Sequence, residues 1–203
     1  ALLQAMQEKT VTVGGKDHGL PQPFHVFATQ NPIEQEGTYP LPEAQLDRFL
    51  MQVNIDYPDA SAERSILQLV RQEAQGNEGA APPALTQQTL FAARKSLLSM
   101  HMSPVVEEYI VNLTLASRQP AQYDKDLSKW IEYGVSPRGT IGLDICARAS
   151  AFLADRDFVT PDDVQSVVHD VFRHRLITSF EAEATGISAD TIIDRLLEQV
   201  ATA

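Results

Sequence analysis

The sequence predicts a mixed chain, with an α/β segment up to about residue 58 and an all-helical domain after it. Short apolar, β-rich runs separated by Gly and Pro fill the first segment. From residue 59 onward, apolar residues recur at helical spacing, and several stretches start at Ser or Thr followed by Pro, which is typical of a helix N-terminus. We therefore expect two domains, residues 1–58 and residues 59–203.

The composition is that of a folded globular chain and disfavours several functional classes. Of the 203 residues, 43% are hydrophobic and 21% are charged. No apolar run approaches the ~20 residues that a membrane span needs. The formal net charge of −11 disfavours nucleic-acid binding, because that affinity comes mainly from cations placed on phosphates. The single cysteine, Cys146, excludes an internal disulfide, fits a reducing compartment and lies on an apolar helix face typical of core packing.

A helix and a β-hairpin are expected at the start of the first segment. Residues 1–8 place Leu and Met on one face but have no capping residue ahead of them. We therefore expect the chain to be a piece of a longer protein and its first residue to lie inside a helix. Residues 10–13 alternate and precede a Gly-rich turn at 14–19, which predicts a hairpin.

Two strands and a short helix are expected next. Residues 24–29 form a short apolar run that suits a buried strand of a parallel sheet. Residues 51–55 alternate like a further strand. Between them, Pro42 can open a short helix over residues 43–49.

Helices dominate the sequence from residue 59 onward. Each is marked by apolar residues on one face, by a capping residue, or by both. The markers in chain order are Ile66, Leu67 and Val70; Leu90, Leu97 and Leu98; Ser103 and Pro104; Ser136 and Pro137; Thr160 and Pro161; and Ser188 with Ile192, Leu196 and Val200.

Three polar residues are candidates for a functional site, and each has an ordinary structural alternative. Asn31 follows the first predicted strand of the sheet, where ligands gather in open parallel sheets, although Asn-Pro is also a turn dipeptide. Arg48 offers a donor fork suited to phosphate, or a surface ion pair with Glu43 or Asp47. Arg138 falls in the first turn of a helix, where a cation opposes the helix dipole. An anionic ligand nearby would explain that position, and so would screening by solvent.

Other kinds of site are not indicated by the sequence. The five histidines lack metal-ligand spacing, and Asp162 and Asp163 are better explained as helix-start residues than as ligands. We therefore predict no metal ligand. The chain contains no Gly-x-x-x-x-Gly-Lys-Ser/Thr motif, so Gly14 and Gly15 indicate a turn and not a phosphate cradle.

Several segments together resemble the MoxR family of AAA+ ATPases. The order and spacing of these segments agree over essentially the whole chain, and the segment from Asn31 to Phe49 is very specific. The segments are residues 1–8, 11–15, 27–32, 36–49 and 136–138. The resemblance implies that residues 1–58 are the last strands of a P-loop AAA+ parallel sheet with a β-hairpin insert. It implies that residues 59–203 are an α-helical lid.

The resemblance also implies roles for the three candidate residues. Asn31 matches the sensor-1 position, which helps to place the attacking water against the γ-phosphate. Arg48 matches the arginine finger, which is offered to the nucleotide of a neighbouring subunit. Arg138 matches the sensor-2 arginine of the lid, and the sequence leaves open whether it acts on its own subunit or on the neighbour. One departure is Gly139, where the family commonly has Ala; glycine costs a helix up to ~1 kcal/mol.

Members of this family use ATP and Mg²⁺ and assemble into rings, typically hexamers. They are thought to act as chaperones that remodel or activate partner proteins, often with von Willebrand factor A domains. The resemblance implies the same here, in the cytoplasm, without a nucleic-acid partner. The phosphate-binding loop and the acidic Mg²⁺-binding motif would lie before Ala1, so we expect residues 1–203 to be inactive alone. Two alternatives stay open: a helical protein-interaction module without nucleotide chemistry, and an AAA+ protein that acts on nucleic acid, against which the net charge counts.

Overall fold

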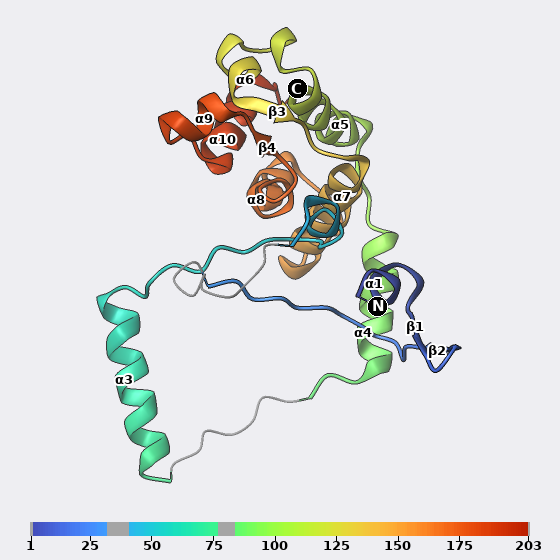
Figure 1. Ribbon diagram of the computed structural model, residues 1–203. Helices are drawn as coiled ribbons and strands as arrows, with labels where there is room; N and C mark the ends of the chain where they lie inside the picture. Colours follow the sequence, from blue (N-terminus) through green and yellow to red (C-terminus); the bar gives the residue numbers. More distant parts are fainter. Residues whose placement is uncertain (1, 32–40, 77–83, 203) are drawn as a thin grey trace.

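The computed structural model describes residues 2–31, 41–76 and 84–202 (Figure 1). The elements of the first half are α1 (Leu2–Glu8), β1 (Thr10–Val13), β2 (Lys16–Gly19), α2 (Glu43–Leu46), α3 (Ala60–Ala74) and α4 (Gln87–Leu98). The second half contains α5 (Pro104–Arg118), the 3₁₀ helix η1 (Pro120–Gln122), α6 (Lys125–Trp130), β3 (Ile131–Tyr133), α7 (Pro137–Leu153), α8 (Pro161–Phe172), β4 (Ile177–Thr178), α9 (Phe180–Thr185) and α10 (Ala189–Gln199). No helix in these ranges is long and apolar enough to cross a membrane.

The hydrophobic core lies among the helices of the second half, which Figure 1 shows gathered in one body. Helices α5, α7, α8 and α10 contribute the apolar faces, and burying each large side chain contributes about 1.5–3 kcal/mol. The largest fully buried side chains include Tyr109, Leu113, Leu143, Phe172, Ile192 and Leu196. Strands β3 and β4 pair antiparallel.

The capping residues expected from the sequence start the helices as predicted. The side-chain oxygens of Ser103, Ser136 and Ser188 each accept a backbone N–H from the first turn of α5, α7 and α10. At α8, the backbone N–H and the hydroxyl of Thr160 both donate to Asp163 Oδ2 at 2.8 Å. Asp163 is therefore a helix-start residue, as expected.

The β-hairpin is confirmed, but its second strand starts earlier than predicted. Strand β2 occupies residues 16–19, inside the stretch expected to be a turn, and Val13 pairs with Lys16. The connection is only Gly14 and Gly15, with φ of +58° and +76°. Because both glycines adopt the left-handed conformation, two residues suffice to reverse the chain.

The strands predicted at residues 24–29 and 51–55 are wrong. Both segments lie outside helices and strands, and Phe27 and Ile55 are 92% and 93% exposed. A strand forms only where a neighbour satisfies its backbone groups, and among the described residues the only sheets are the pairs β1–β2 and β3–β4. The expected parallel sheet is therefore not observed in that part of the chain.

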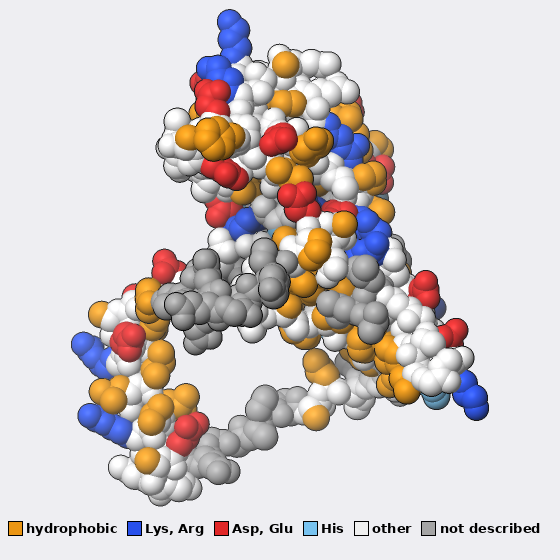
Figure 2. All heavy atoms as spheres, in the orientation of Figure 1, with side chains coloured by type: hydrophobic (Ala, Val, Ile, Leu, Met, Phe, Trp, Pro, Cys, Tyr) orange, Lys and Arg blue, Asp and Glu red, His pale blue; other side chains and the backbone are white. Residues whose placement is uncertain are grey.

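Helix α3 stands apart from the helical body in Figure 1. It forms from local signals: the carboxylate of Asp59 accepts the N–H groups of Ser61 and Ala62, and the helix has no buried residue. Its aliphatic side chains are about half exposed, and Figure 2 shows them on the surface. These side chains are Ile66, Leu67, Leu69 and Val70.

Gly139 has a steric reason in the structure. A Cβ at this position would lie 2.0 Å from Cγ1 of Val135 and 3.4 Å from Arg175 Cδ. The close approach of the chain before α7 therefore excludes alanine unless Val135 moves. The glycine costs some helix propensity but permits the packing that positions the first turn of α7.

Candidate functional site

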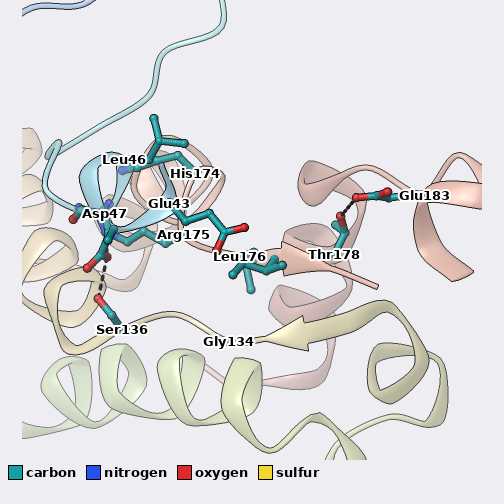
Figure 3. Close-up of a pocket in the computed structure, with 12 residues that line it drawn as sticks. Glu43, Leu46, Asp47, Gly134, Ser136, His174, Arg175, Leu176, Thr178 and Glu183 are labelled. Carbon is teal, nitrogen blue, oxygen red and sulfur yellow. Dashed lines mark hydrogen bonds and ion pairs between the residues drawn. The ribbon is translucent and has the colours of Figure 1, made fainter. Parts of the chain in front are cut away.

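One carboxylate, Asp47, joins the short helix α2 to the helical body. Its Oδ1 accepts a hydrogen bond from Ser136 Oγ at 2.7 Å, and its Oδ2 accepts one from Arg138 Nη1 at 3.2 Å. Arg175 Nε lies 3.3 Å from Oδ1. The Asp47–Ser136 contact is drawn in Figure 3, where Arg175 lies beside Asp47. The end of α2 is thus connected to the start of α7 and to the residues after α8.

The surroundings of Asp47 favour its charged form. Burial raises the pKa of this carboxyl, but the hydrogen bonds from Ser136 and Arg138 and the charges of Arg175 and Arg138 outweigh burial. The pKa of Asp47 therefore lies below its usual range. At neutral pH the site holds one anion between two cations.

Arg175 is buried and holds the backbone around this carboxylate. Its side chain is only 2% exposed. Nη2 donates to the carbonyls of Asp47, at 3.2 Å, and of Phe49. Nη1 donates to the carbonyls of Leu50, at 3.2 Å, and of Val171. A planar guanidinium suits this arrangement because its donors are fixed in one fork.

The two preceding residues bind neighbouring carbonyls of the same segment. His174 Nε2 donates to Phe49 O at 3.1 Å, and Arg173 Nη1 donates to Gln52 O at 2.6 Å. Residues 173–175, here called the basic clasp, thus hold residues 47–52 against the end of α8. Burial, with the neighbouring charge of Arg175, lowers the pKa of His174 to about 4, so this histidine is neutral at pH 7.

Of the predicted site residues, Arg138 forms an ion pair with Asp47, and Arg48 is the residue that follows Asp47 in the chain. Arg138 is in the first turn of α7 with its side chain 47% exposed, and the carboxylate of Asp47 lies beside it. This ion pair offsets the unfavourable place of Arg138 in the helix dipole, and an anionic ligand at Arg138 stays a prediction. Arg48 follows Asp47 and is half-buried; its Nε donates to Ala44 O at 3.2 Å. Among the described residues Arg48 forms no ion pair with Glu43 or Asp47, so that alternative is wrong.

Asn31 does not belong to this cluster in the part of the chain described. It is exposed, lies on an extended segment and is the last residue of the range 2–31. Its role as a sensor stays a prediction. Part of the segment on which the family resemblance depends, residues 32–40, lies outside the described residues.

A pocket of about 440 Å³ opens beside Asp47 (Figure 3). It lies between α2, the residues before α7 and the segment leading into β4. Its walls include Glu43, Leu46, Ser136, His174 and Thr178. Residues 2–31, 41–76 and 84–202 contain no group of three His, Cys, Asp or Glu that could hold a metal ion.

The environment of Cys146 does not support a role as a catalytic nucleophile. The thiol is buried in the core, and burial raises its pKa to about 11. A protonated, inaccessible thiol is a poor nucleophile. The structure thus confirms the expectation of core packing for this residue.

The sequence did not single out the basic clasp or assign Asp47 its bridging role. Arg175 contacts residues more than a hundred positions earlier in the chain, which no local pattern reports. The available signal was weak: three basic residues, 173–175, stand between the buried Phe172 and Leu176 at the end of an amphipathic helix. Such residues are usually explained by the helix dipole.

Two family models match separate parts of the chain. Residues 1–51 match the ATPase family associated with various cellular activities (AAA), and residues 125–196 match the AAA lid domain. Both the end of α2 and the basic clasp lie in matched regions.

Similar proteins cover nearly the whole chain. Chaperone MoxR1 of Mycobacterium tuberculosis is 40% identical over 99% of this chain and 52% of its own length. Protein MoxR of Paracoccus denitrificans is 34% identical over 88% of this chain and 55% of its own length. The crystal structure of a predicted ATPase from Cytophaga hutchinsonii superposes with a TM-score of 0.92 at 40% identity, covering 98% of this chain and 60% of that one.

The chain thus spans between about half and three-fifths of the length of the proteins it matches. The matches to an AAA model and an AAA lid model lie in the same order along the chain as the two predicted domains. The relatives named MoxR agree with the resemblance seen in the sequence. The chain therefore belongs to the MoxR family of AAA ATPases.

Proposed function

We propose that this chain is part of an ATPase that couples ATP binding and hydrolysis to chaperone-like remodelling or activation of partner proteins. Residues 1–58 supply the end of the ATPase core, and residues 59–203 supply the lid. The observation that supports this most directly is the ion pair between Arg138 and Asp47, the residue immediately before Arg48. It joins the two segments that carry the proposed finger and the proposed sensor-2 arginine, while the Arg48 side chain itself donates to Ala44 O.

The residues present fit a phosphate ligand. Arg138 is half exposed and uses Nη1 for Asp47, which leaves further donors of a planar fork for phosphate oxygens. Nη1 of Arg48 is buried and has no hydrogen-bond partner among the described residues, so this side chain would have to turn outward to reach the nucleotide of a neighbouring subunit. The acidic ligands of Mg²⁺ and the phosphate-binding loop belong, in this proposal, to residues before Ala1.

In this mechanism the chain's residues supply placement and positive charge. ATP, when bound with Mg²⁺, supplies the γ-phosphoryl group that is transferred to water. Asn31 orients the water, Arg138 binds phosphate oxygens, and Arg48 stabilises the developing charge on the nucleotide of a neighbouring subunit. An arginine in this last role contributes ~10³–10⁵ in rate. Hydrolysis would therefore depend on assembly.

The assembly and the partners follow from the same proposal. We propose a ring, typically a hexamer, located in the cytoplasm. Its partners would be proteins, including proteins with von Willebrand factor A domains. The acidic net charge of −11 supports a protein partner over nucleic acid.

The test is steady-state ATP hydrolysis by the full-length protein with Arg48→Ala and, separately, with Asn31→Ala. Arg48→Ala should lower turnover by at least ~10³-fold while ATP binding is largely kept, because a finger acts mainly in the transition state. Asn31→Ala should lower hydrolysis more than affinity. Arg64→Ala, an exposed arginine on α3, is the matched control and should hydrolyse ATP normally.

Two results would contradict the assignments. Turnover near that of the unchanged protein in Arg48→Ala would remove the finger. An equal loss of hydrolysis and affinity in Asn31→Ala would indicate a structural turn instead of a sensor.

A further inference from the structure

We infer that Arg175 is a positioning residue for Arg48, an inference that rests on the proposed function. Nη2 of Arg175 donates to the carbonyls of Asp47 and Phe49, which are the residues immediately before and after Arg48. The guanidinium therefore holds the backbone on both sides of the proposed finger. Arg175 itself touches neither nucleotide nor the Arg48 side chain in this role.

The backbone at Arg48 depends on such a contact. Helix α2 is only four residues long, and only turn hydrogen bonds continue it, from Arg48 N to Gln45 O at 3.1 Å and from Phe49 N to Leu46 O at 3.0 Å. The carbonyls of Asp47, Phe49 and Leu50, which follow the helix, accept hydrogen bonds from Arg175 of the helical body instead.

The position of Arg175 is fixed by the core. Arg175 lies three residues after Phe172, which is fully buried, and its backbone N donates to Phe172 O at 2.8 Å. Because a guanidinium presents its donors in a rigid plane, the carbonyls of Asp47, Phe49 and Leu50 take up fixed places relative to α8. The place of Arg48 is thereby set by the lid.

The same carboxylate connects Arg175 with Arg138. Asp47 lies 3.3 Å from Arg175 Nε and 3.2 Å from Arg138 Nη1. The positions of both proposed phosphate-binding arginines therefore depend on one buried residue of the lid, Arg175. A shift of Arg175 would displace Arg48 first, through the two carbonyls, and Arg138 only through Asp47.

The experiment compares kcat and ATP affinity in the full-length protein with Arg175→Met, Arg48→Ala and the double variant. We expect Arg175→Met to lower kcat by about 10²-fold, the effect of misplacing a catalytic group by about an ångström, while ATP affinity changes little. The double variant should be no slower than Arg48→Ala alone, because Arg175 acts through Arg48.

Arg148→Met is the matched control. Arg148 is also mostly buried, and it binds a carboxylate, Asp144, and a backbone carbonyl, Met100 O, on the same helical body. It should keep its kcat once folding is checked by thermal unfolding. Arg175→Lys keeps the charge but not the fork, so it should lose most of the activity that Arg175→Met loses. If Arg175→Met does not fold, Arg175→Lys takes its place in the double variant.

The outcomes separate this inference from the proposed function. Full kcat in a folded Arg175 variant, with Arg48→Ala still impaired, would overturn the inference and leave the finger in place. A double variant that is slower than Arg48→Ala, by the factor that the Arg175 change causes alone, would also overturn it. No effect of Arg48→Ala would instead remove the proposed finger itself.

Discussion

At the residue scale, His174 shows how one buried nitrogen sets a response to pH. Its Nε2 donates to Phe49 O, and its Nδ1 is buried without a hydrogen-bond partner in the part of the chain described. A second proton would have to be placed on that nitrogen beside the charge of Arg175. Burial and this charge together lower the pKa from 6.5 to about 4.

The free energy of unfolding should therefore fall as the pH is lowered from 6.5 to about 4. In this range the unfolded state binds a proton at His174 that the folded state does not bind. His174→Gln keeps a donor for Phe49 but removes the titration, so its stability should depend less on pH. Urea unfolding of both proteins across this range measures the difference. His18→Gln, an exposed histidine on β2, should behave like the unchanged protein, and equal slopes for His174→Gln would contradict the assignment.

The sequence indicated that the position of Arg138 needs an explanation. Arg138 opposes the dipole of α7, for which an anionic ligand or screening by solvent was expected, and the structure places the carboxylate of Asp47 beside it. Arg175 could not be predicted in its role, because its partners lie at residues 47–50 and become neighbours only in the folded chain. Local patterns report contacts within a helical turn, and these contacts are not local.

At the scale of elements, the helices that begin at a capping residue could be predicted from the sequence. The short strands, which depend on pairing with distant residues, could not. Ser103, Ser136 and Ser188 contact backbone groups within three residues, so the sequence alone contains the interaction. Strand β3 depends on pairing with β4, more than forty residues later, and Ser179 N donates to Trp130 O at 2.8 Å between the same two regions. Residues 24–29 have β-strand composition, but composition cannot supply a neighbouring strand.

The start of helix α8 allows a prediction on stability. Asp163 is 3% exposed, accepts a hydrogen bond from Arg156 Nη1 at 2.7 Å and also accepts the Thr160 N–H. Burial raises its pKa, but these bonds outweigh burial, so its pKa is lowered and its stabilising effect is lost as the pH falls below the usual range. Asp163→Asn should lower the free energy of unfolding at pH 7 by about 2 kcal/mol, as measured in urea.

Asp162→Asn is the control for this change. It alters the same charge in the same helical turn, but Asp162 is exposed. Its effect should stay within about 0.5 kcal/mol, as for most surface substitutions. Similar losses in the two variants would show that net charge, and not the contacts of Asp163, stabilises the start of α8.

At the scale of the whole molecule, packing is uneven. Apart from Ala5, the buried hydrophobic residues among those described lie between Met100 and Val200, whereas the first half contributes mainly exposed segments and the α2 region held by the basic clasp. The change from exposed segments to a packed core therefore lies near Met100, because helices α3 and α4, which follow residue 58, have no buried residue. The division into residues 1–58 and 59–203 stays a prediction.

Residues 1–203 prepared alone should bind ATP at most feebly and should not hydrolyse it. The chain contains no Gly-x-x-x-x-Gly-Lys-Ser/Thr loop to hold the phosphates, and Arg48 and Arg138 would supply only part of the proposed site. Calorimetric titration with ATP and Mg²⁺ measures this, with the full-length protein as the control. Tight, Mg²⁺-dependent binding of ATP by the 203-residue chain would contradict this expectation and show that the chain forms a complete nucleotide site by itself.

Helix α3 has a practical consequence for handling the chain. Four aliphatic side chains of this helix, each between 48% and 55% exposed, form an apolar surface, and the helix has no buried residue. Precipitation of the 203-residue chain during concentration would begin at this helix. Lysine or glutamate in place of Leu67 or Leu69 would keep the preparation dispersed without disturbing the core.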